Sequence, residues 1–557
     1  MAQVGLHDLW SAGGGAYYGQ DLYYTPEQFG AIGDGIADDT LPILNCYVAC
    51  PAGGAIKFSK PSYRTTRRWL IQKKISVEAS RSEIFFDPIL PLVDDRAVLV
   101  HSGDVIGTDI SALRDVAGAI SIGDPSFTAV NVADVADLVA GDWVQIQETE
   151  AGVLDEIVVI DWAQVLSVAG AVVTVVRGFR TSFPATHDTV QFRRIIRLVE
   201  GVSIKGLKIR TTNAVNTLLG FAVGIAKDTI LTECVSDVRV GNGYYSYRAK
   251  GLRVTNCSQY GQITQTTEFA ATVDLQVSSN YFNQETPTAD VGAAPINLDF
   301  GTAFFTVDSN VLNGGWLYAA SLMFGCHDGS VRGNVCSWVG AGVPTIGILS
   351  IGSFRVICAE NIVDGVTGVG GIGIAFYSTN GYGPGVWVTH IVTEENLIVF
   401  NLVRNCTSEF GVMAVGDTYI SGTDGTGIGG SVNVKKILDL SGVAPQFRET
   451  ALVGTNPIYN ILTNTGGRVF YGVDNSVGNA FVGAGSPYAF CILTESARAI
   501  VLGTQNLERM RFLADGKIRI SGLSSFANDV AAGVGGLTTG MLYLETGTDP
   551  LRVTSKI

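Results

Sequence analysis

Short strand-like phrases recur along residues 198–440, and each pairs apolar positions with a polar turn. Aligned on the turn, one slot is filled in succession by Cys234, Cys257, Asn280, Asn310, Asn334, Asn361 and Asn396. The intervals range from 23 to 35 residues, which is typical of a fixed turn combined with loops of variable length. Asn tolerates the left-handed backbone of a tight corner, and stacked Asn amides can bond to one another. We therefore predict that each repeat is one rung of a parallel β-helix, because one rung cannot bury its inward face alone.

A second strand in each repeat carries the candidate chemistry. Its phrases align as Tyr247 to Lys250, Thr267 to Ala270, Leu298 to Gly301 and Leu322 to Gly325. Side chains alternate along a strand, so this alignment predicts an inward aromatic stack of Phe269, Phe300 and Phe324. It also predicts an outward column of Arg248, Glu268, Asp299 and Met323.

Two acidic residues of this column are the candidate catalytic residues. Parallel strands lie ~4.8 Å apart, so Glu268 and Asp299 are expected as adjacent carboxylates on the outer face. Two close carboxyl groups separate their pKa values, so that one can donate a proton while the other stays charged. Glycoside hydrolysis uses such a pair. The alternative is that both are solvated surface acids, or that Arg248 neutralises one of them in an ordinary ion pair.

Aromatic and polar residues nearby are candidate substrate-binding groups. Aromatic rings provide stacking surfaces for sugars, and this region is rich in them; Tyr244, Tyr245, Tyr247, Trp316 and Tyr318 are the candidates. Subunit contacts are an alternative use for the same rings. Arg248 is expected to determine which of the two acids stays ionised. His327 with Asp328 could supply a base on the next rung. The alternative for this pair is that both are ordinary polar residues of a turn.

Residues 24–117 open the β-helix, and residues 1–23 form an arm with no core of its own. Asp38 or Asp39 can cap a short helix whose Leu41, Leu44 and Tyr47 or Val48 share one face. The stretch Phe29-Gly30-Ala31-Ile32-Gly33-Asp34-Gly35, with Asp38, Asp39 and Thr40, resembles the opening motif of the pectate-lyase-like β-helix superfamily. That superfamily includes polygalacturonase-like proteins and many phage tailspikes. The resemblance implies a right-handed parallel β-helix and a capping role for these aspartates.

Two further segments differ in pattern from the rungs. Residues 118–197 show strand-like runs between Gly and Asp turns, so we predict a small inserted β-domain there. Residues 441–557 resemble the C-terminal modules of phage tail fibres and tailspikes, which are typically intertwined trimers, and Asp515-Gly516 suits a hairpin turn. The resemblance implies a homotrimer held by a C-terminal β-rich module, with residues 1–23 docking to a phage tail or baseplate protein.

Composition supports an all-β protein and narrows its partners. The 557 residues include 68 glycines and 16% charged residues, with a net charge of −14. That charge argues against a nucleic-acid partner. The nine cysteines show no metal-ligand spacing, so we expect no metal and no cofactor. No signal peptide and no apolar run of membrane-spanning length is visible. The chain is then expected to be made in the host cytoplasm and to act outside the cell as part of the virion tail.

Three functions fit these patterns. The first is a tailspike depolymerase that binds and cleaves a bacterial capsule, exopolysaccharide or O-antigen, as a glycoside hydrolase or as a lyase. The second is a receptor-binding spike without catalysis. The third is a structural tail or baseplate component. The acid pair favours the first of these.

Overall fold

The computed structural model describes residues 23–88, 96–101, 109–149, 157–183, 190–211, 219–238, 241–260, 267–283, 294–313, 320–323, 325–337, 346–366, 372–377, 396–399, 401–404, 406, 408–413, 418–421, 458–464, 467–473, 490–494, 499–504, 507–513, 517–521, 523, 525–535, 542–545 and 552–555. The chain divides into two compact units, residues 1–437 and 438–557. No helix among the described residues is long and apolar enough to cross a membrane.

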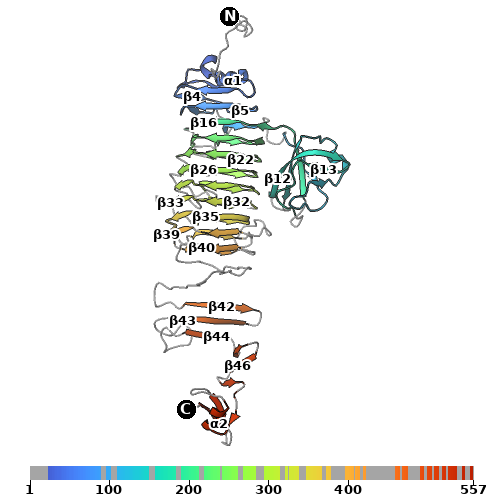
Figure 1. Ribbon diagram of the computed structural model, residues 1–557. Coiled ribbons are helices and arrows are strands. Elements are labelled where there is room, and N and C mark those ends of the chain that lie inside the picture. Colours follow the sequence, from blue (N-terminus) through green and yellow to red (C-terminus); the bar gives the residue numbers. More distant parts are fainter. Residues whose placement is uncertain are drawn as a thin grey trace, which may run out of the picture. The chain divides into compact units, whose positions relative to one another are not determined.

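The first unit is a parallel β-helix, in which three long sheets run along the stack of rungs (Figure 1). Sheet A contains twelve strands: β1 (Tyr23–Tyr24), β3 (Ala55–Phe58), β6 (Ser76–Ala79), β16 (Ser203–Lys205), β20 (Ile230–Thr232), β23 (Arg253–Thr255), β26 (Gln276–Ser278), β29 (Thr306–Asp308), β32 (His327–Arg332), β35 (Phe354–Ala359), β38 (Asn396–Val399) and β41 (Thr418–Ser421). Sheet B contains eleven: β2 (Asp34–Asp38), β4 (Ser62–Thr65), β7 (Glu83–Phe86), β17 (Lys208–Arg210), β21 (Val235–Asp237), β24 (Ser258–Gln259), β27 (Tyr281–Asn283), β30 (Val311–Asn313), β33 (Val335–Ser337), β36 (Ile362–Asp364) and β39 (Leu402–Arg404). Sheet C contains ten: β5 (Trp69–Ile71), β8 (Arg96–Val100), β18 (Leu219–Val223), β22 (Tyr244–Tyr247), β25 (Thr267–Ala270), β28 (Ile296–Asp299), β31 (Ala320–Met323), β34 (Ile346–Ile351), β37 (Ile372–Tyr377) and β40 (Ser408–Met413). The predicted parallel β-helix is confirmed.

The corner between sheets A and B is built on an asparagine ladder. The amide of Asn280 donates to Oδ1 of Asn310 at 2.9 Å, and the same bond continues from Asn310 to Asn334, from Asn334 to Asn361 and from Asn361 to Asn401. The predicted alignment of Asn280, Asn310, Asn334 and Asn361 at one corner is confirmed. The prediction for Asn396 is wrong: it opens β38 and bonds to Val356 and Ser353, so that Asn401 takes its place.

The left-handed backbone of this corner belongs to the residue before the asparagine in the rungs of Asn280, Asn310, Asn334 and Asn361. Ser279, Ser309 and Glu360 have φ of 57°, 56° and 58°, whereas the ladder asparagines that follow them are not left-handed. The expectation that asparagine itself adopts the strained conformation is therefore wrong. Its side chain is fixed by the ladder, and the preceding residue makes the turn.

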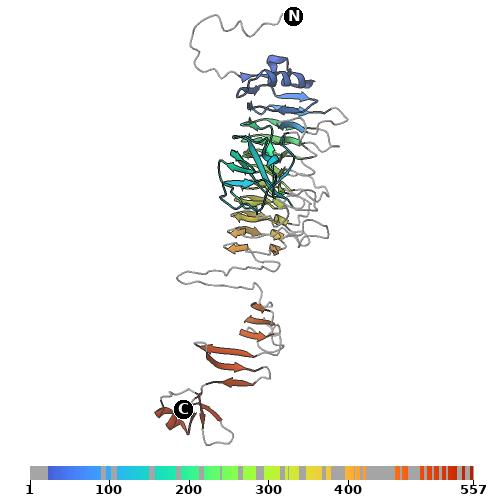
Figure 2. The same cartoon turned by 90° about the vertical axis from the view of Figure 1, so that its right-hand side faces the viewer.

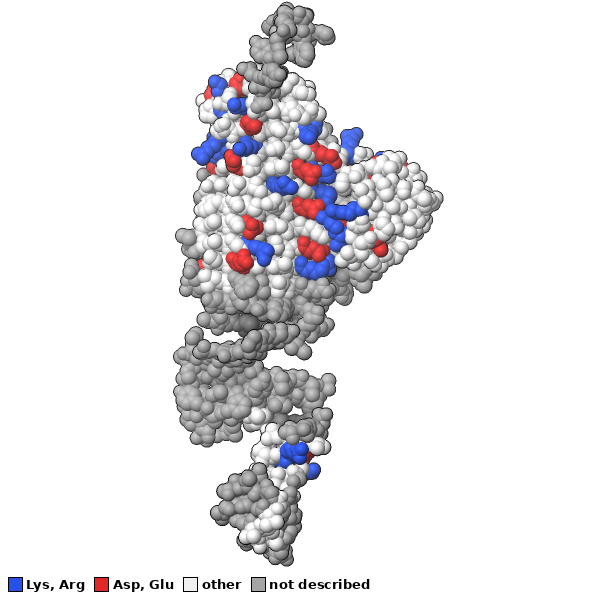
Figure 3. Space-filling model, in the orientation of Figure 1, with Lys and Arg blue, Asp and Glu red and all other residues white. Residues whose placement is uncertain are grey.

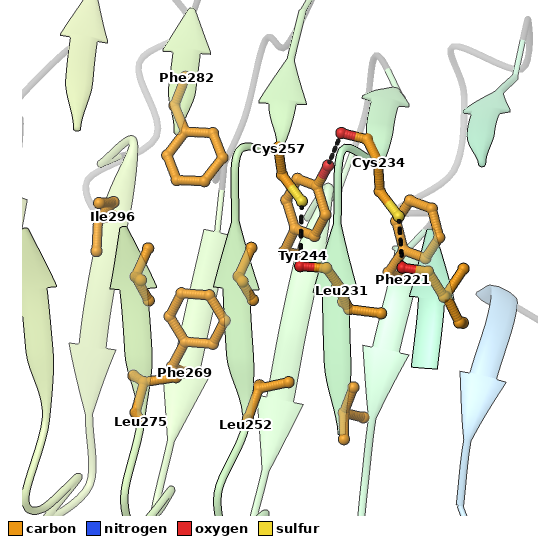
Figure 4. Packing of buried hydrophobic residues seen from close by; sticks show 14 of the residues in the cluster. Phe221, Leu231, Cys234, Tyr244, Leu252, Cys257, Phe269, Leu275, Phe282 and Ile296 are labelled. Carbon is orange, nitrogen blue, oxygen red and sulfur yellow. Dashed lines mark hydrogen bonds between the residues drawn. The ribbon is translucent and has the colours of Figure 1, made fainter. Parts of the chain in front are cut away.

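Inward-facing side chains form one core along the rungs (Figure 4). Val277, Val307 and Val331 are fully buried in it, as the repeat predicts. Seven described cysteines are buried and form no disulfide bond; the Sγ atoms of Cys234 and Cys257 donate to backbone carbonyls of neighbouring rungs. Cysteine thus acts here as a small core residue.

A short helix covers the first rungs. Helix α1 (Thr40–Ala49) follows the 3₁₀ helix η2 (Pro26–Phe29), and Oδ1 of Asp38 accepts from the Thr40 amide at its start. The buried side chains are Ile43, Cys46 and Tyr47, whereas Leu41 and Val48 are exposed. The predicted capping role is confirmed for Asp38, but the predicted buried face is wrong for Leu41 and Val48. Asp39 instead accepts from the Ile32 and Gly33 amides of the opening motif.

An inserted domain lies beside the rungs (Figures 1 and 2). It is a six-stranded antiparallel sheet with its own core, made of β10 (Ser126–Thr128), β13 (Val172–Val175), β12 (Ile157–Ala169), β11 (Trp143–Thr149), β14 (Val190–Ile195) and β9 (Arg114–Asp115), with the 3₁₀ helix η3 (Val132–Val135). The β-helix resumes with β15 (Val199–Glu200), which pairs with β19 (Ala226–Lys227).

The second unit contains three three-stranded sheets and one helix. The strands are β42 (Ile458–Asn464), β43 (Gly467–Val473), β44 (Phe490–Thr494), β45 (Ile500–Thr504), β46 (Leu507–Phe512), β47 (Ile518–Ile520), β48 (Ser525–Phe526), β49 (Leu542–Glu545) and β50 (Arg552–Ser555), and the helix is α2 (Asp529–Val534). β46 and β47 pair antiparallel, which agrees with the hairpin predicted between them.

Candidate functional site

Glu268 lies on the outer face of sheet C. It is the second residue of β25, between the inward Thr267 and Phe269, and its carboxylate accepts a hydrogen bond of 3.0 Å from the amide of Asn242. Burial raises the pKa of the Glu268 carboxyl above its ordinary value, and the bond from Asn242 offsets part of this rise. A carboxyl group with a raised pKa stays protonated to higher pH, as a proton donor must.

Asp299 lies on the same face, one rung further and two residues along the strand. Glu268 pairs with Asn297, and Asp299 pairs with Ala270. The predicted direct adjacency of the two acids is therefore wrong. From the strand spacing and rise, their Cα atoms lie about 8 Å apart. Oδ1 of Asp299 accepts from the Phe300 amide at 2.9 Å, which fixes one side of the carboxylate.

The predicted inward aromatic stack is also wrong. Phe269 is fully buried, but its neighbours in the rungs before and after are Ser246 and Leu298. Phe300 follows the strand with φ of 49° and packs toward the inserted domain, and Phe324 lies outside the described residues. The predicted alignment is thus off by two residues between β25 and β28, which preserves the face of both acids, and by three residues between β22 and β25, which does not.

Arg248 is buried between the β-helix and the inserted domain. Its guanidinium donates to Oε1 of Gln145 at 2.6 Å and of Gln147 at 3.0 Å, and it lies 4.9 Å from the centre of the Tyr247 ring. Arg248 is 6% exposed, so its predicted outward position in the acid column is wrong. Its role in substrate binding stays a prediction that this burial does not favour. Tyr247 is half-buried against the same border.

His327 and Asp328 also face the inserted domain. Nε2 of His327 accepts from the Ile160 amide at 3.4 Å, Nδ1 lies 2.8 Å from Asp328, and the ring stacks on Phe354. Burial lowers the pKa of the His327 imidazole, although the Asp328 carboxylate opposes this. Burial alone would raise the pKa of Asp328, but hydrogen bonds from Arg355 and His327 lower it to about 2. These contacts make a fixed joint between the domains, and a role as substrate base stays a prediction.

The contact between His327 and the inserted domain should depend on pH. His327 accepts the Ile160 amide only when it is neutral, and the charged groups around it are Asp328, Arg355 and Asp161. The pKa of His327 is lower in the folded protein than in the unfolded chain, where it is ~6.5. The contribution of neutral His327 to folding stability is therefore fully present above that pH and is lost as the pH falls through the pKa of the folded state. We expect the protection factor of the Ile160 amide against hydrogen exchange, which corrects for the intrinsic pH dependence of exchange, to fall below about pH 6.5, and His327→Gln to remove this step. Equal protection factors at pH 8 and pH 5 in the wild type would contradict this prediction.

The other aromatic residues predicted to bind substrate do not lie together on one face. Trp316 and Tyr318 lie outside the described residues. Tyr244 points inward and donates to the carbonyl of Cys234 (Figure 4), so its use as an outer stacking surface is wrong. Tyr245 lies outward, one rung before Glu268. Sequence reasoning missed Asn242 and Asn297, because only the rung register brings them beside Glu268.

Acidic and basic side chains gather along the border between the β-helix and the inserted domain (Figure 3). Arg180 of the inserted domain bonds to Asp161 and to Asp274 of the β-helix, and its guanidinium lies 3.8 Å from the centre of the Phe304 ring. Lys250 bonds to the same Asp274. The pair of Arg180 with Asp274 therefore links the inserted domain to the rungs that carry the site. No group of three or more potential metal-ligating side chains occurs among the described residues.

Several solved structures are similar to this chain. The tailspike gp49 of Pseudomonas phage LKA1 matches with 16% identity over 74% of this chain and 79% of that chain, with a TM-score of 0.39. The Gp54 tailspike of Acinetobacter baumannii bacteriophage AP22, solved with A. baumannii capsular saccharide, matches with 11% identity over 72% and 77%, with a TM-score of 0.36. The surface adhesin PfbA of Streptococcus pneumoniae matches with 11% identity over 80% and 97%, with a TM-score of 0.42. No known family model and no curated protein matches.

Proposed function

We propose that the protein is a bacteriophage tailspike that binds a bacterial surface polysaccharide and hydrolyses it through the carboxyl groups of Glu268 and Asp299. The observation that supports this most directly is Glu268, a half-buried acid with a raised pKa on the outer face of a long parallel sheet. The opening motif at Phe29–Gly35 and the tail-fibre-like phrases after residue 441 support the tailspike assignment.

The two acids divide the chemistry of hydrolysis between them. Glu268 gives its proton to the glycosidic oxygen as the bond from that oxygen to the anomeric carbon breaks. Asp299 takes a proton from the water that attacks this carbon from the opposite side. Retaining enzymes hold their carboxyl groups ~5–5.5 Å apart and inverting enzymes ~6.5–9.5 Å apart, to admit a water. The Cα separation of about 8 Å leaves room for either distance, and the division of roles given above corresponds to the inverting route.

A panel of purified capsules, exopolysaccharides and O-antigens tests the proposal. The full chain is incubated with each polymer, and new reducing ends and unsaturated products are measured separately. New reducing ends without unsaturated products support hydrolysis, whereas unsaturated uronates indicate a lyase. Binding without any product favours the second candidate, a receptor-binding spike, whose supporting observation is that Glu268 and Asp299 are not direct neighbours.

The outer face of sheet B supports assembly with further copies of the chain. An outward column along its central rungs is apolar, and it consists of Tyr281, Val311, Val335, Ile362 and Leu402. Val311 and Val335 are 39% and 37% exposed. Contiguous exposed apolar side chains mark contact surfaces, and closed symmetry would cover them. The proposed assembly is a homotrimer, with residues 1–23 docking to a phage tail or baseplate protein.

The trimer makes a specific prediction. Light scattering on the protein without residues 1–23 should give the mass of three chains. Val311→Lys with Val335→Lys should shift the equilibrium toward monomer, because two charges on adjacent rungs would be buried at the contact. Thr306→Lys, on the outer face of sheet A, is the control and should stay trimeric. A wild-type monomer would refute the trimer, and an unaffected double variant would leave sheet B outside the contact.

A further inference from the structure

A cavity of about 200 Å³ lies between the inserted domain and the β-helix. A single water needs only ~10–15 Å³ on this measure, so the cavity can hold an organic ligand. Its walls come from both domains: Trp143, Trp162 and Arg177 from the inserted domain, and Lys250 and Asp274 from the rungs. We propose that this cavity binds one acidic sugar unit, a pyranose carrying a carboxylate. The inference rests on the proposed polysaccharide function and assigns a second contact away from Glu268.

Two indole rings line the cavity, and one of them has a surface that suits a sugar. The rings of Trp143 and Trp162 lie 6.4 Å apart, inclined at 54°. Trp162 is 2% exposed, and no described residue accepts a hydrogen bond from its indole N–H. The Trp162 N–H is therefore enclosed in the protein and does not reach a ligand in the cavity. Trp143 is half-buried, and its indole ring can pack against the apolar face of a sugar.

The charges around the cavity favour an anionic ligand. Asp161 and Asp274 are both bonded to Arg180, and Asp274 also to Lys250. Two acids are thus matched by two bases. Arg177 is exposed at the cavity and, within the described part of the chain, has no ion-pair partner. The positive charge of Arg177 is therefore not balanced by an acid at the cavity. A guanidinium group can bind a carboxylate in a bidentate manner.

The test uses the full chain and simple glycosides. Binding of the methyl glycosides of glucuronic and galacturonic acid is measured by saturation-transfer and titration NMR, with the matching glucoside and galactoside as neutral probes. We expect the wild type to prefer a uronide. Arg177→Gln should weaken uronide binding by about tenfold or more, the size expected for a lost charge-assisted bond.

Val176 offers a matched pair of variants at the same cavity. It lines the cavity and is 57% exposed, so a longer polar side chain is tolerated there. Val176→Glu should weaken uronide binding, whereas Val176→Lys should preserve or strengthen it. Arg253→Gln, an exposed arginine on sheet A, is the control and should change nothing.

The outcomes separate this inference from the proposed function. Polymer cleavage by a wild type that binds no uronide would overturn the acidic-sugar site and leave the function standing. Uronide binding with an affinity that is unchanged by Arg177→Gln and Val176→Glu would also overturn the proposed acidic-sugar site. Uronide binding that depends on Arg177, in a protein that neither binds nor cleaves any polymer, would support the site and overturn the proposed function.

Discussion

Glu268→Gln should lower depolymerase activity by about 10²–10⁴-fold, the usual contribution of a general acid. The amide keeps the size of the side chain and can still bond to Asn242, but it has no proton to give to the leaving oxygen. Asp299→Asn should cause a loss of the same order if Asp299 activates the water. Both variants should keep their assembly and their affinity for the polymer, since neither loses volume. Reducing-end assays at matched protein concentration measure the effect.

The pH dependence of the depolymerase activity is a second test of the role of Glu268. Glu268 must be protonated, so activity should fall as the pH rises through its raised pKa. Asn242→Ala removes the one hydrogen bond that lowers this pKa and should move the alkaline limb of kcat upward. A change in folding alone would leave the limb in place.

Glu360→Gln is the matched control, because Glu360 is an exposed glutamate at the corner between sheets A and B. It should retain full activity. Turnover of Glu268→Gln at the wild-type rate would refute the acid assignment, and the active site would then have to be sought elsewhere.

The corner between sheets A and B could be predicted from the sequence because it is short and repeats the same chemistry. Each ladder asparagine is followed directly by a strand of sheet B, while the connections elsewhere in the rungs vary in length. Asn396 was mistaken for a member because it follows a similar phrase, IVTEEN. Asn401 carries the ladder bond instead, five residues later. The phrase alone does not show which of two nearby asparagines turns the corner.

The position of the acids on sheet C could be predicted only in part. Alternation along a strand determines which face a residue takes, and a shift of two residues preserves that face. The alignment therefore predicts the outer face and the neighbouring rungs of Glu268 and Asp299 correctly, but their register along the strands is wrong by two residues. Loops of different length precede these strands, so the sequence does not determine the register.

The surroundings of Arg248 and His327 could not be predicted at all. Their partners Gln145, Gln147 and Ile160 lie 103, 101 and 167 residues away in sequence. An inserted domain folds back on rungs that come later in the chain, and nothing in the local pattern of either segment marks this contact. The cavity at Trp143 and Lys250 belongs to the same border.

Asn310→Ala should destabilise the β-helix by about 3 kcal/mol or more, since buried polar groups without partners cost ~1–3 kcal/mol each. Oδ1 of Asn310 accepts from the backbone and side-chain amides of Asn280, and Nδ2 donates to the Val277 carbonyl and to Asn334. Alanine would leave these buried groups unpaired in the middle of the ladder. Asn313→Ala is the control: Asn313 ends β30, the strand that follows Asn310, on the outer face, where it bonds to Asn283, and its loss should cost less than about 1 kcal/mol. Urea unfolding at equal protein concentration measures both midpoints. Equal losses in the two variants would show that the ladder contributes no more than an ordinary surface amide pair.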